Sequence, residues 1–282
     1  MSLENRVKLA PVVVLAYLNQ AKAQESYELA KLGKEQALEL GLPELVTINT
    51  AIANTFNQPP DINNTITELS FACESYPERW VICNLLANTL FSEQRFTEAA
   101  NVLENILEKK PNHTLLVVKL ADSYVRAEDT ENAELYVYAL LKKYPKQPYV
   151  NLLAATLELK KENFNSALNY INSAMNSGLT SPQAKLIASL VNYQLGSNEQ
   201  AMNHLRSLKS SFPDNPLVTK LYIAIQLRLG DTDSITEAYS DARASKDNSE
   251  IFALAGLELL KSGKSVKSAE LLQKIDTSLI EN

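Results

Sequence analysis

The sequence predicts an all-α protein, an α-solenoid of about eight antiparallel helix pairs, and three observations lead to this fold class. Proline recurs at one interval, because Pro43, Pro77, Pro111, Pro145 and Pro213 are separated by 34 residues or a multiple of 34. Small and apolar residues recur at fixed distances from these prolines. No stretch alternates between apolar and polar residues for long enough to form a sheet. The period therefore indicates an array of repeated two-helix units.

We call the positions that recur every 34 residues, most of them occupied by the prolines named above, the grid positions. The first helix of each unit is expected directly after its grid position. An apolar stripe begins nine and ten residues after each grid position, as at Leu86 and Ala87 or at Leu120 and Ala121. Adjacent apolar positions that return in every unit are typical of a helix that packs between two neighbours. The array therefore has one such helix after each grid position.

The second helix of each unit is predicted from the residues before the grid position. Positions twelve, eight and five residues before it are four and three residues apart, which places them on one face of a helix. The small residue at the first position marks the point where two helices must approach closely. The three sets are Ala99, Ala133, Ala167, Ala201, Ile235 and Ala269; Leu69, Leu103, Val137, Ile171, Leu205 and Tyr239; and Leu38, Ala72, Ile106, Leu140, Ala174, Leu208 and Ala242.

Turn residues agree with this division of the chain. Ser181-Pro182 and Asn215-Pro216 are expected to open helices as a cap followed by a first-turn proline. Between the two helices of a unit, the end of the first helix needs a residue that tolerates positive φ. The residues expected there are Gly196, Gly230 and Gly263, with the neighbouring Asp129, Asn163 and Asp231.

We expect one repeat array over residues 1–282, because each unit of such an array packs only on its neighbours. It comprises a divergent N-terminal helical pair (1–42), core repeats (43–246) and a C-terminal capping pair (247–282). The apolar run from Leu9 to Leu18 follows two basic residues and imitates a signal peptide. Leu18 lies 34 residues before Ile52, so we interpret the run as the first helix of the array. It is also too short to span a bilayer, which takes about 20 apolar residues.

Composition and motifs exclude several classes of function. A net charge of −6 and a pI near 5.2 argue against nucleic acid as the partner. His113 and His204 are 91 residues apart without a spaced carboxylate or cysteine, so we expect solvated histidines and no metal site. The sequence contains no phosphate-binding glycine loop and no nucleophile motif. We therefore predict no catalytic residues, no cofactor and no enzymatic activity.

Cys73 and Cys83 lie on two helices that are expected to pack against each other, which makes a disulfide topologically possible. Nine residues separate them, a spacing that matches neither a redox nor a zinc motif. The sequence favours buried free thiols that fill small core sites. An exported location would favour the disulfide instead.

The prolines and alanines described above resemble the tetratricopeptide repeat over nearly the whole chain, most strongly from Pro77 to Tyr239. The large aromatic of the family's first helix is mostly replaced, so these repeats are divergent. The resemblance implies a right-handed superhelix whose first helices line a concave groove that binds a peptide or helical segment. The groove candidates are Asn54, Asn84, Asn88, Lys119, Asp122, Arg126, Tyr149, Thr156, Lys160, Tyr193, Gln194, Lys220 and Arg228.

These side chains suit a protein partner. Asn offers a donor and an acceptor to a peptide backbone, Lys and Arg pair with carboxylates, and Tyr offers flat apolar area with a polar tip. Some domains of this family hold a C-terminal carboxylate between Lys, Asn and Arg at set positions. Asn88 and Lys119 occupy two of those positions, but Asn84 and Leu115 stand where basic residues belong. We therefore do not expect that clamp here.

The predicted function is a non-catalytic scaffold for protein–protein interaction. The stretch from Ala184 to Ala242 also resembles repeats of the tetratricopeptide lipoproteins of PEP-CTERM/exosortase systems in Gram-negative bacteria. That resemblance implies a piece of an exported, membrane-anchored protein of sorting, exopolysaccharide or biofilm systems, whereas a complete chain would be cytoplasmic. The alternatives are a ligand- or peptide-sensing regulator and the substrate-recruiting arm of a larger enzyme. Self-association through the terminal repeats is a further expectation, because Leu271, Leu272 and Ile280 lie near an end without a following repeat.

Overall fold

A computed structural model describes residues 23–54, 61–213, 215–230 and most of 253–273. Within these ranges the chain forms helices connected by turns and contains no strand. The predicted all-α fold class is therefore confirmed. The chain divides into two compact units, Met1–Tyr136 and Val137–Asn282, and we describe each by itself.

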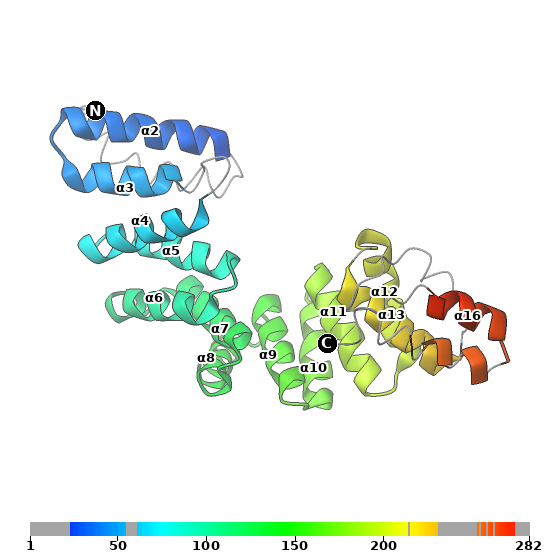
Figure 1. Cartoon of the computed structure of the whole chain (residues 1–282). Coiled ribbons are helices and arrows are strands. Elements are labelled where there is room, and N and C mark those ends of the chain that lie inside the picture. Colours follow the sequence, from blue (N-terminus) through cyan, green and yellow to red (C-terminus); the bar gives the residue numbers. More distant parts are fainter. Residues whose placement is uncertain are drawn as a thin grey trace. The chain divides into compact units, whose positions relative to one another are not determined.

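The first unit is a series of helices, and those between residues 23 and 127 each pack on the next in sequence. Figure 1 shows them in order from blue to green. They are α2 (Ala23–Glu39), α3 (Pro43–Asn54), α4 (Ile62–Ser75), α5 (Trp80–Ser92), α6 (Phe96–Lys109), α7 (Thr114–Ala127) and the first half of α8 (Thr130–Lys143).

The second unit continues the same pattern, and α9 to α13 again pack in sequence order. Its helix α11 also contacts the helices two places before and after it, α9 and α13. The helices are the second half of α8, α9 (Pro148–Lys160), α10 (Phe164–Asn176), α11 (Pro182–Gln194), α12 (Asn198–Ser211), α13 (Pro216–Leu229) and α16 (Ser265–Gln273). Helical residues 255–257 and 259–261 precede α16.

The crossing points of the helices carry the predicted small residues. Ala99, Ala133, Ala167 and Ala201 are all 0% exposed, as expected where two backbones approach closely. The apolar positions four and seven residues later are buried from Leu69 onward through α12. In α10 these positions share one core with residues of α9, the first helix of the same repeat, and of α11, the first helix of the next repeat.

Two positions of the predicted pattern are wrong, and both errors are register shifts of one residue. Leu38 is 59% exposed, while the preceding Ala37 is fully buried. Pro43 is the first residue of α3, whereas Pro77 lies three residues before the first residue of α5. A position counted back from the proline therefore does not fall at the same place in the preceding helix of each repeat. Near the C-terminus Ala269 is exposed and the preceding Ser268 is buried in its place. The hydroxyl of Ser268 donates to the carbonyl of Gly256 at 2.7 Å, which fixes the shifted register.

The turns between paired helices recur with the same period as the prolines. Positive φ occurs at positions 94, 128, 162, 196 and 230, so each turn has one left-handed residue. Gly196 and Gly230 are two of them, as predicted, but Gln94, Glu128 and Glu162 occupy the other three. Asp129 and Asn163, which we expected to tolerate positive φ, instead follow the left-handed residue and precede the next helix.

Cap chemistry follows the sequence closely. Ser181 Oγ accepts a hydrogen bond from the Ala184 N–H at 3.2 Å, and Asn215 Oδ1 accepts one from the Val218 N–H at 3.1 Å. A proline occupies the first turn of both helices, where its missing N–H is not needed. Both predicted helix starts are therefore confirmed.

The expectation of two free thiols is wrong, because Cys73 and Cys83 form a disulfide. Cys73 lies in the last turn of α4 and Cys83 in the first turn of α5. The tight turn between these helices brings the two Cα atoms to 4.9 Å, inside the range that a disulfide needs. The sequence spacing matches no motif because the pairing depends on the turn, which closes the distance between two helix ends.

Several predictions concern residues outside the described ranges. They are the first helix over Leu9–Leu18, the positions of Ile235, Tyr239 and Ala242, the turn residue Asp231 and the terminal Ile280. The division of 1–282 into one array with two end pairs stays a prediction. No described helix combines the length and the hydropathy needed to cross a membrane.

Candidate partner-binding face

Three pairs of successive first helices, α3–α5, α5–α7 and α11–α13, are connected by side chains that lie 35 residues apart, one repeat plus one residue. In each of these rungs a basic side chain reaches back to the preceding first helix. The extra residue follows from the stagger of stacked helices, so the 34-residue period alone does not reveal the pairing. The four rungs are Arg79 to Glu44 (2.6 Å), Lys119 to Asn84 (3.1 Å), Arg126 to the ring of Phe91 (5.1 Å) and Arg228 to Tyr193 (2.5 Å).

Three predicted groove residues meet on α5 and α7. The ammonium group of Lys119 donates to Asn84 Oδ1 at 3.1 Å and to Asn88 Oδ1 at 2.8 Å. Lys119 is half-buried, and this burial lowers the pKa of its side chain. Among the described residues no carboxylate pairs with it. The charge of Lys119 is therefore held by two neutral amide oxygens.

One turn further along α7, Asp122 and Arg126 form an ion pair with an Nε–Oδ1 distance of 2.9 Å. Asp122 is only 6% exposed, so its carboxylate is largely committed to this pair. The guanidinium of Arg126 also lies 5.1 Å from the ring centroid of Phe91 and 5.8 Å from that of Phe96. This side chain therefore connects α7 to the turn between α5 and α6. We call Asn84, Asn88, Lys119, Asp122 and Arg126 the α5–α7 face.

In the second unit, two predicted residues meet where α13 packs beside α11. The guanidinium of Arg228 stacks 3.6 Å above the ring centroid of Tyr193 and donates to the Tyr193 carbonyl at 2.5 Å. The other predicted residues lie outside these two groups: Tyr149, Thr156 and Lys160 on α9, Gln194 at the end of α11, Lys220 on α13, and Asn54 at the end of α3 in the first unit. The structure thus brings five of the thirteen candidates into the α5–α7 face and two into the Arg228 pair.

The two histidines are not the solvated surface groups that we expected. His113 is half-buried, packs against Trp80 with ring centroids 5.2 Å apart, and has a buried Nδ1 without a hydrogen-bond partner. His204 is also half-buried, and burial together with the nearby Lys185 charge lowers its pKa. Within the described part of the chain no three His, Cys, Asp or Glu side chains gather as metal ligands.

Two tyrosine–glutamate pairs, which sequence reasoning missed, join a second helix to the following first helix. In the first unit the Tyr124 hydroxyl of α7 donates to Glu104 Oε1 of α6 at 2.5 Å. In the second unit the Tyr138 hydroxyl of α8 donates to Glu158 Oε1 of α9. Positions 104 and 138 are 34 residues apart, as are 124 and 158, so the two residue types exchange places between adjacent repeats. Comparing residues one period apart would have found this exchange.

The second pair is part of a larger polar network. Asn163 Nδ2 donates to Glu158 Oε2 at 3.0 Å, and Lys161 Nζ lies 3.5 Å from Glu158 Oε1. Burial acts to raise the pKa of Glu158, but the hydrogen bonds from Tyr138 and Asn163 and the charge of Lys161 outweigh it and lower the pKa. Burial and the bond to Glu158 raise the pKa of Tyr138 to about 12. The network holds a buried carboxylate in its ionised form.

Comparison with known proteins finds one family match over part of the chain and several similar folds. Residues 90–157 match the family model described as Tetratricopeptide repeat. The fold resembles a tetratricopeptide repeat protein from Parabacteroides merdae ATCC 43184, with a TM-score of 0.55 and 14% identity over 89% of this chain and 92% of that one. It also resembles Pseudomonas aeruginosa PilF (TM-score 0.58, 18% identity, 78% and 98% of the two chains) and yeast Tom70 (0.53, 16%, 86% and 61%). No curated protein matches the sequence.

Proposed function

We propose, from the tetratricopeptide-repeat fold of this chain, that it is a non-catalytic scaffold whose α5–α7 face binds an extended segment of a protein partner. The observation that carries this proposal is the desolvated ammonium of Lys119, which has only amide oxygens as partners. A half-buried cation without a counter-charge is stabilised when a carboxylate comes within about 4 Å. We therefore assign Lys119 to an acidic side chain or chain terminus of the partner.

The neighbouring amides suit the backbone of the same segment. Asn84 and Asn88 each give one side-chain oxygen to Lys119, and their amide N–H groups can donate to peptide carbonyls. Asn88 is exposed, while Asn84 is half-buried. The Asp122–Arg126 pair limits the face on one side and leaves Lys119 as its main uncompensated charge. The face thus combines one cationic contact with backbone recognition.

A peptide selection tests this proposal. The whole chain is used to select 12-residue peptides from a display library, and the affinities of the selected peptides are measured by calorimetry. We expect acidic peptides, and we expect Lys119→Met to weaken them about 10- to 100-fold, because a charge-assisted hydrogen bond contributes about 1.5–3 kcal/mol. Lys109→Met, which removes an exposed lysine at the end of α6, is the matched control. Selected peptides without carboxylates, or acidic peptides that bind the Lys119 variant equally well, would refute the proposal.

The disulfide favours an exported location for this scaffold. Disulfides persist in oxidising compartments and are rare in a reducing cytosol. The Cys73–Cys83 bond therefore supports the proposal that the chain works outside the cytoplasm, as the resemblance to the exosortase-associated lipoproteins implies. Alkylation of cells that express the chain, followed by mass spectrometry, tests the location. Protected cysteines in the native host support export, and two alkylated thiols contradict it.

A further inference from the structure

A pocket in the first unit lies between α4 and α6, with residues of α5 as its floor. Its volume is about 290 Å³. The apolar lining comprises Ile66, Leu86, Leu90 and Val102, and Ser70 contributes a hydroxyl. Sites for drug-sized ligands start at about 300 Å³. This pocket therefore suits a single side chain better than a whole small molecule.

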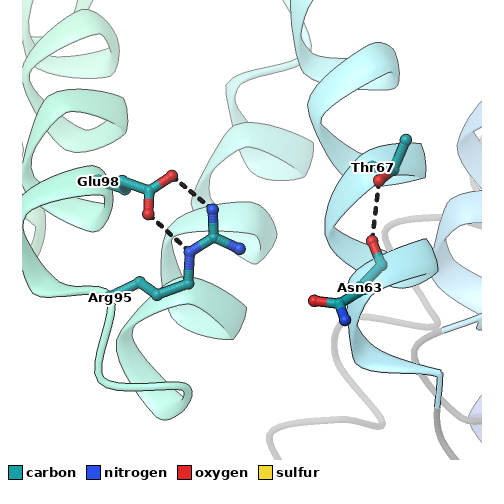
Figure 2. A network of polar contacts seen from close by, with 4 residues as sticks. All are labelled: Asn63, Thr67, Arg95 and Glu98. Carbon is teal, nitrogen blue, oxygen red and sulfur yellow. Dashed lines mark hydrogen bonds and ion pairs between the residues drawn. The ribbon is translucent and has the colours of Figure 1, made fainter.

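The rim of the pocket is polar. Arg95, at the start of α6, forms two contacts of 2.6 Å with the carboxylate of Glu98. Figure 2 shows this pair together with the hydrogen bond from Thr67 to the Asn63 carbonyl on α4. Glu74 adds a second carboxylate to the lining, next to the apolar floor. An occupant with an apolar body and a polar tip matches this distribution.

The next repeat shows what fills the equivalent position. One period after Leu90 and Val102 stand Tyr124 and Tyr136, whose rings stack with centroids 5.7 Å apart at 17°. One period after Ser70 stands Glu104, which accepts the Tyr124 hydroxyl. In the earlier repeat all three side chains are smaller. The pocket is therefore the space that two tyrosine rings and a glutamate occupy one repeat later.

We propose that this pocket binds a tyrosine side chain of a partner polypeptide, as a second site independent of the α5–α7 face. The ring replaces the missing aromatic against Leu90 and Val102, and the hydroxyl meets the polar lining that begins at Ser70. A peptide-linked tyrosine is preferred to the free amino acid, because the free amino acid would bring its own carboxylate close to Glu74 and Glu98. The occupant is thus an internal tyrosine of a polypeptide.

Methyl NMR of the full chain tests the site with N-acetyl-L-tyrosinamide as the probe. We expect saturable shifts of the Ile66, Leu86, Leu90 and Val102 methyls, with a dissociation constant on the order of 1 mM for a ligand of this size. The methyls of Ile171, buried in the second unit, should not move. N-acetyl-L-leucinamide and free tyrosine are the comparison ligands, and either one binding as well as the probe would overturn the proposal.

Two variants sharpen the test. The double variant Leu90→Tyr/Val102→Tyr copies the next repeat and should abolish the shifts of the remaining Ile66 and Leu86 methyls while the Ile171 signals stay unchanged. Ser70→Glu supplies the acceptor that Glu104 provides one repeat later, so it should tighten the tyrosinamide about threefold or more and leave N-acetyl-L-phenylalaninamide unchanged. Binding that survives in the filled double variant, or a Ser70→Glu variant that treats the two aromatic amides alike, would refute the assignment.

Discussion

Exchange of Tyr138 and Glu158 is the perturbation that best tests how adjacent repeats are held together. The exchanged double variant Tyr138→Glu/Glu158→Tyr has the arrangement that Glu104 and Tyr124 adopt one repeat earlier. Each single variant breaks the pair in a different way: Tyr138→Glu places two carboxylates together, and Glu158→Tyr places two hydroxyls together. We expect both single variants to be destabilised and the double variant to be less destabilised than the sum of the two.

The magnitude follows from burial and from the number of bonds. Glu158 is 5% exposed and accepts hydrogen bonds from Tyr138 and Asn163. A hydrogen bond to a charged group contributes about 1.5–3 kcal/mol, so each single variant should lose about 2 kcal/mol or more. Contacting residues couple by about 0.5–3 kcal/mol, and we expect a favourable coupling of about 2 kcal/mol here. Recovery should be incomplete, because Asn163 loses its carboxylate acceptor.

Urea unfolding of the four proteins measures this coupling through the midpoints and slopes. Far-ultraviolet circular dichroism and the fluorescence of Trp80 should be followed together, because repeat arrays can depart from two-state unfolding. Tyr138→Phe/Glu158→Gln is the control that removes both charge and donor without exchange. If the exchanged variant is as unstable as the sum of its single variants, the pair is not a transferable contact and the reasoning fails.

Three further predictions concern the turns, the disulfide and acid. Glu128→Gly should stabilise the chain by about 0.5–1 kcal/mol, because it relieves a left-handed residue, whereas Glu131→Gly in the first turn of α8 should destabilise it by up to about 1 kcal/mol; urea midpoints distinguish the two. Reduction, or the double variant Cys73→Ser/Cys83→Ser, should cost about 2–3 kcal/mol by the same assay, and no change would mean that the bond does not constrain the unfolded chain. The lowered pKa of Glu158 gives stability that is complete above its ordinary value of 4.5 and is lost as the pH falls through the lower folded value, so Glu158→Gln should flatten the acid limb of a stability–pH curve below that pH.

Much of the fold could be predicted because a repeat shows the same requirement many times. Ala99 and Ala133 mark crossing points that accept nothing larger, and one period relates them in sequence and in space. Leu38 failed because the period identifies a proline but not its place relative to the helix start, and Pro43 lies inside α3. A shift of one residue moves a side chain about 100° around a helix, which is enough to expose it.

The contacts of the candidate site were harder to predict than its members. Lys119 and Asn88 could be selected from the family resemblance, but their direct contact depends on the stagger between α5 and α7. The disulfide was missed for a related reason: a ten-residue separation between Cys73 and Cys83 has no motif, and only the turn geometry brings the two atoms together. Sequence periodicity describes each helix, whereas these features depend on how neighbouring helices are offset.

The alternating tyrosine–glutamate pairs also bear on how such a gene can change. Unequal recombination between tandem copies readily removes or adds one period. Loss of residues 110–143 would make α9 follow α6 and set Glu104 opposite Glu158, two carboxylates with no hydroxyl between them. Duplication of the same segment would set Tyr138 opposite a second Tyr124. Because the order of tyrosine and glutamate reverses between adjacent repeats, each repeat matches only its own neighbours. A protein whose repeats had been deleted or duplicated would therefore fold less stably than its parent.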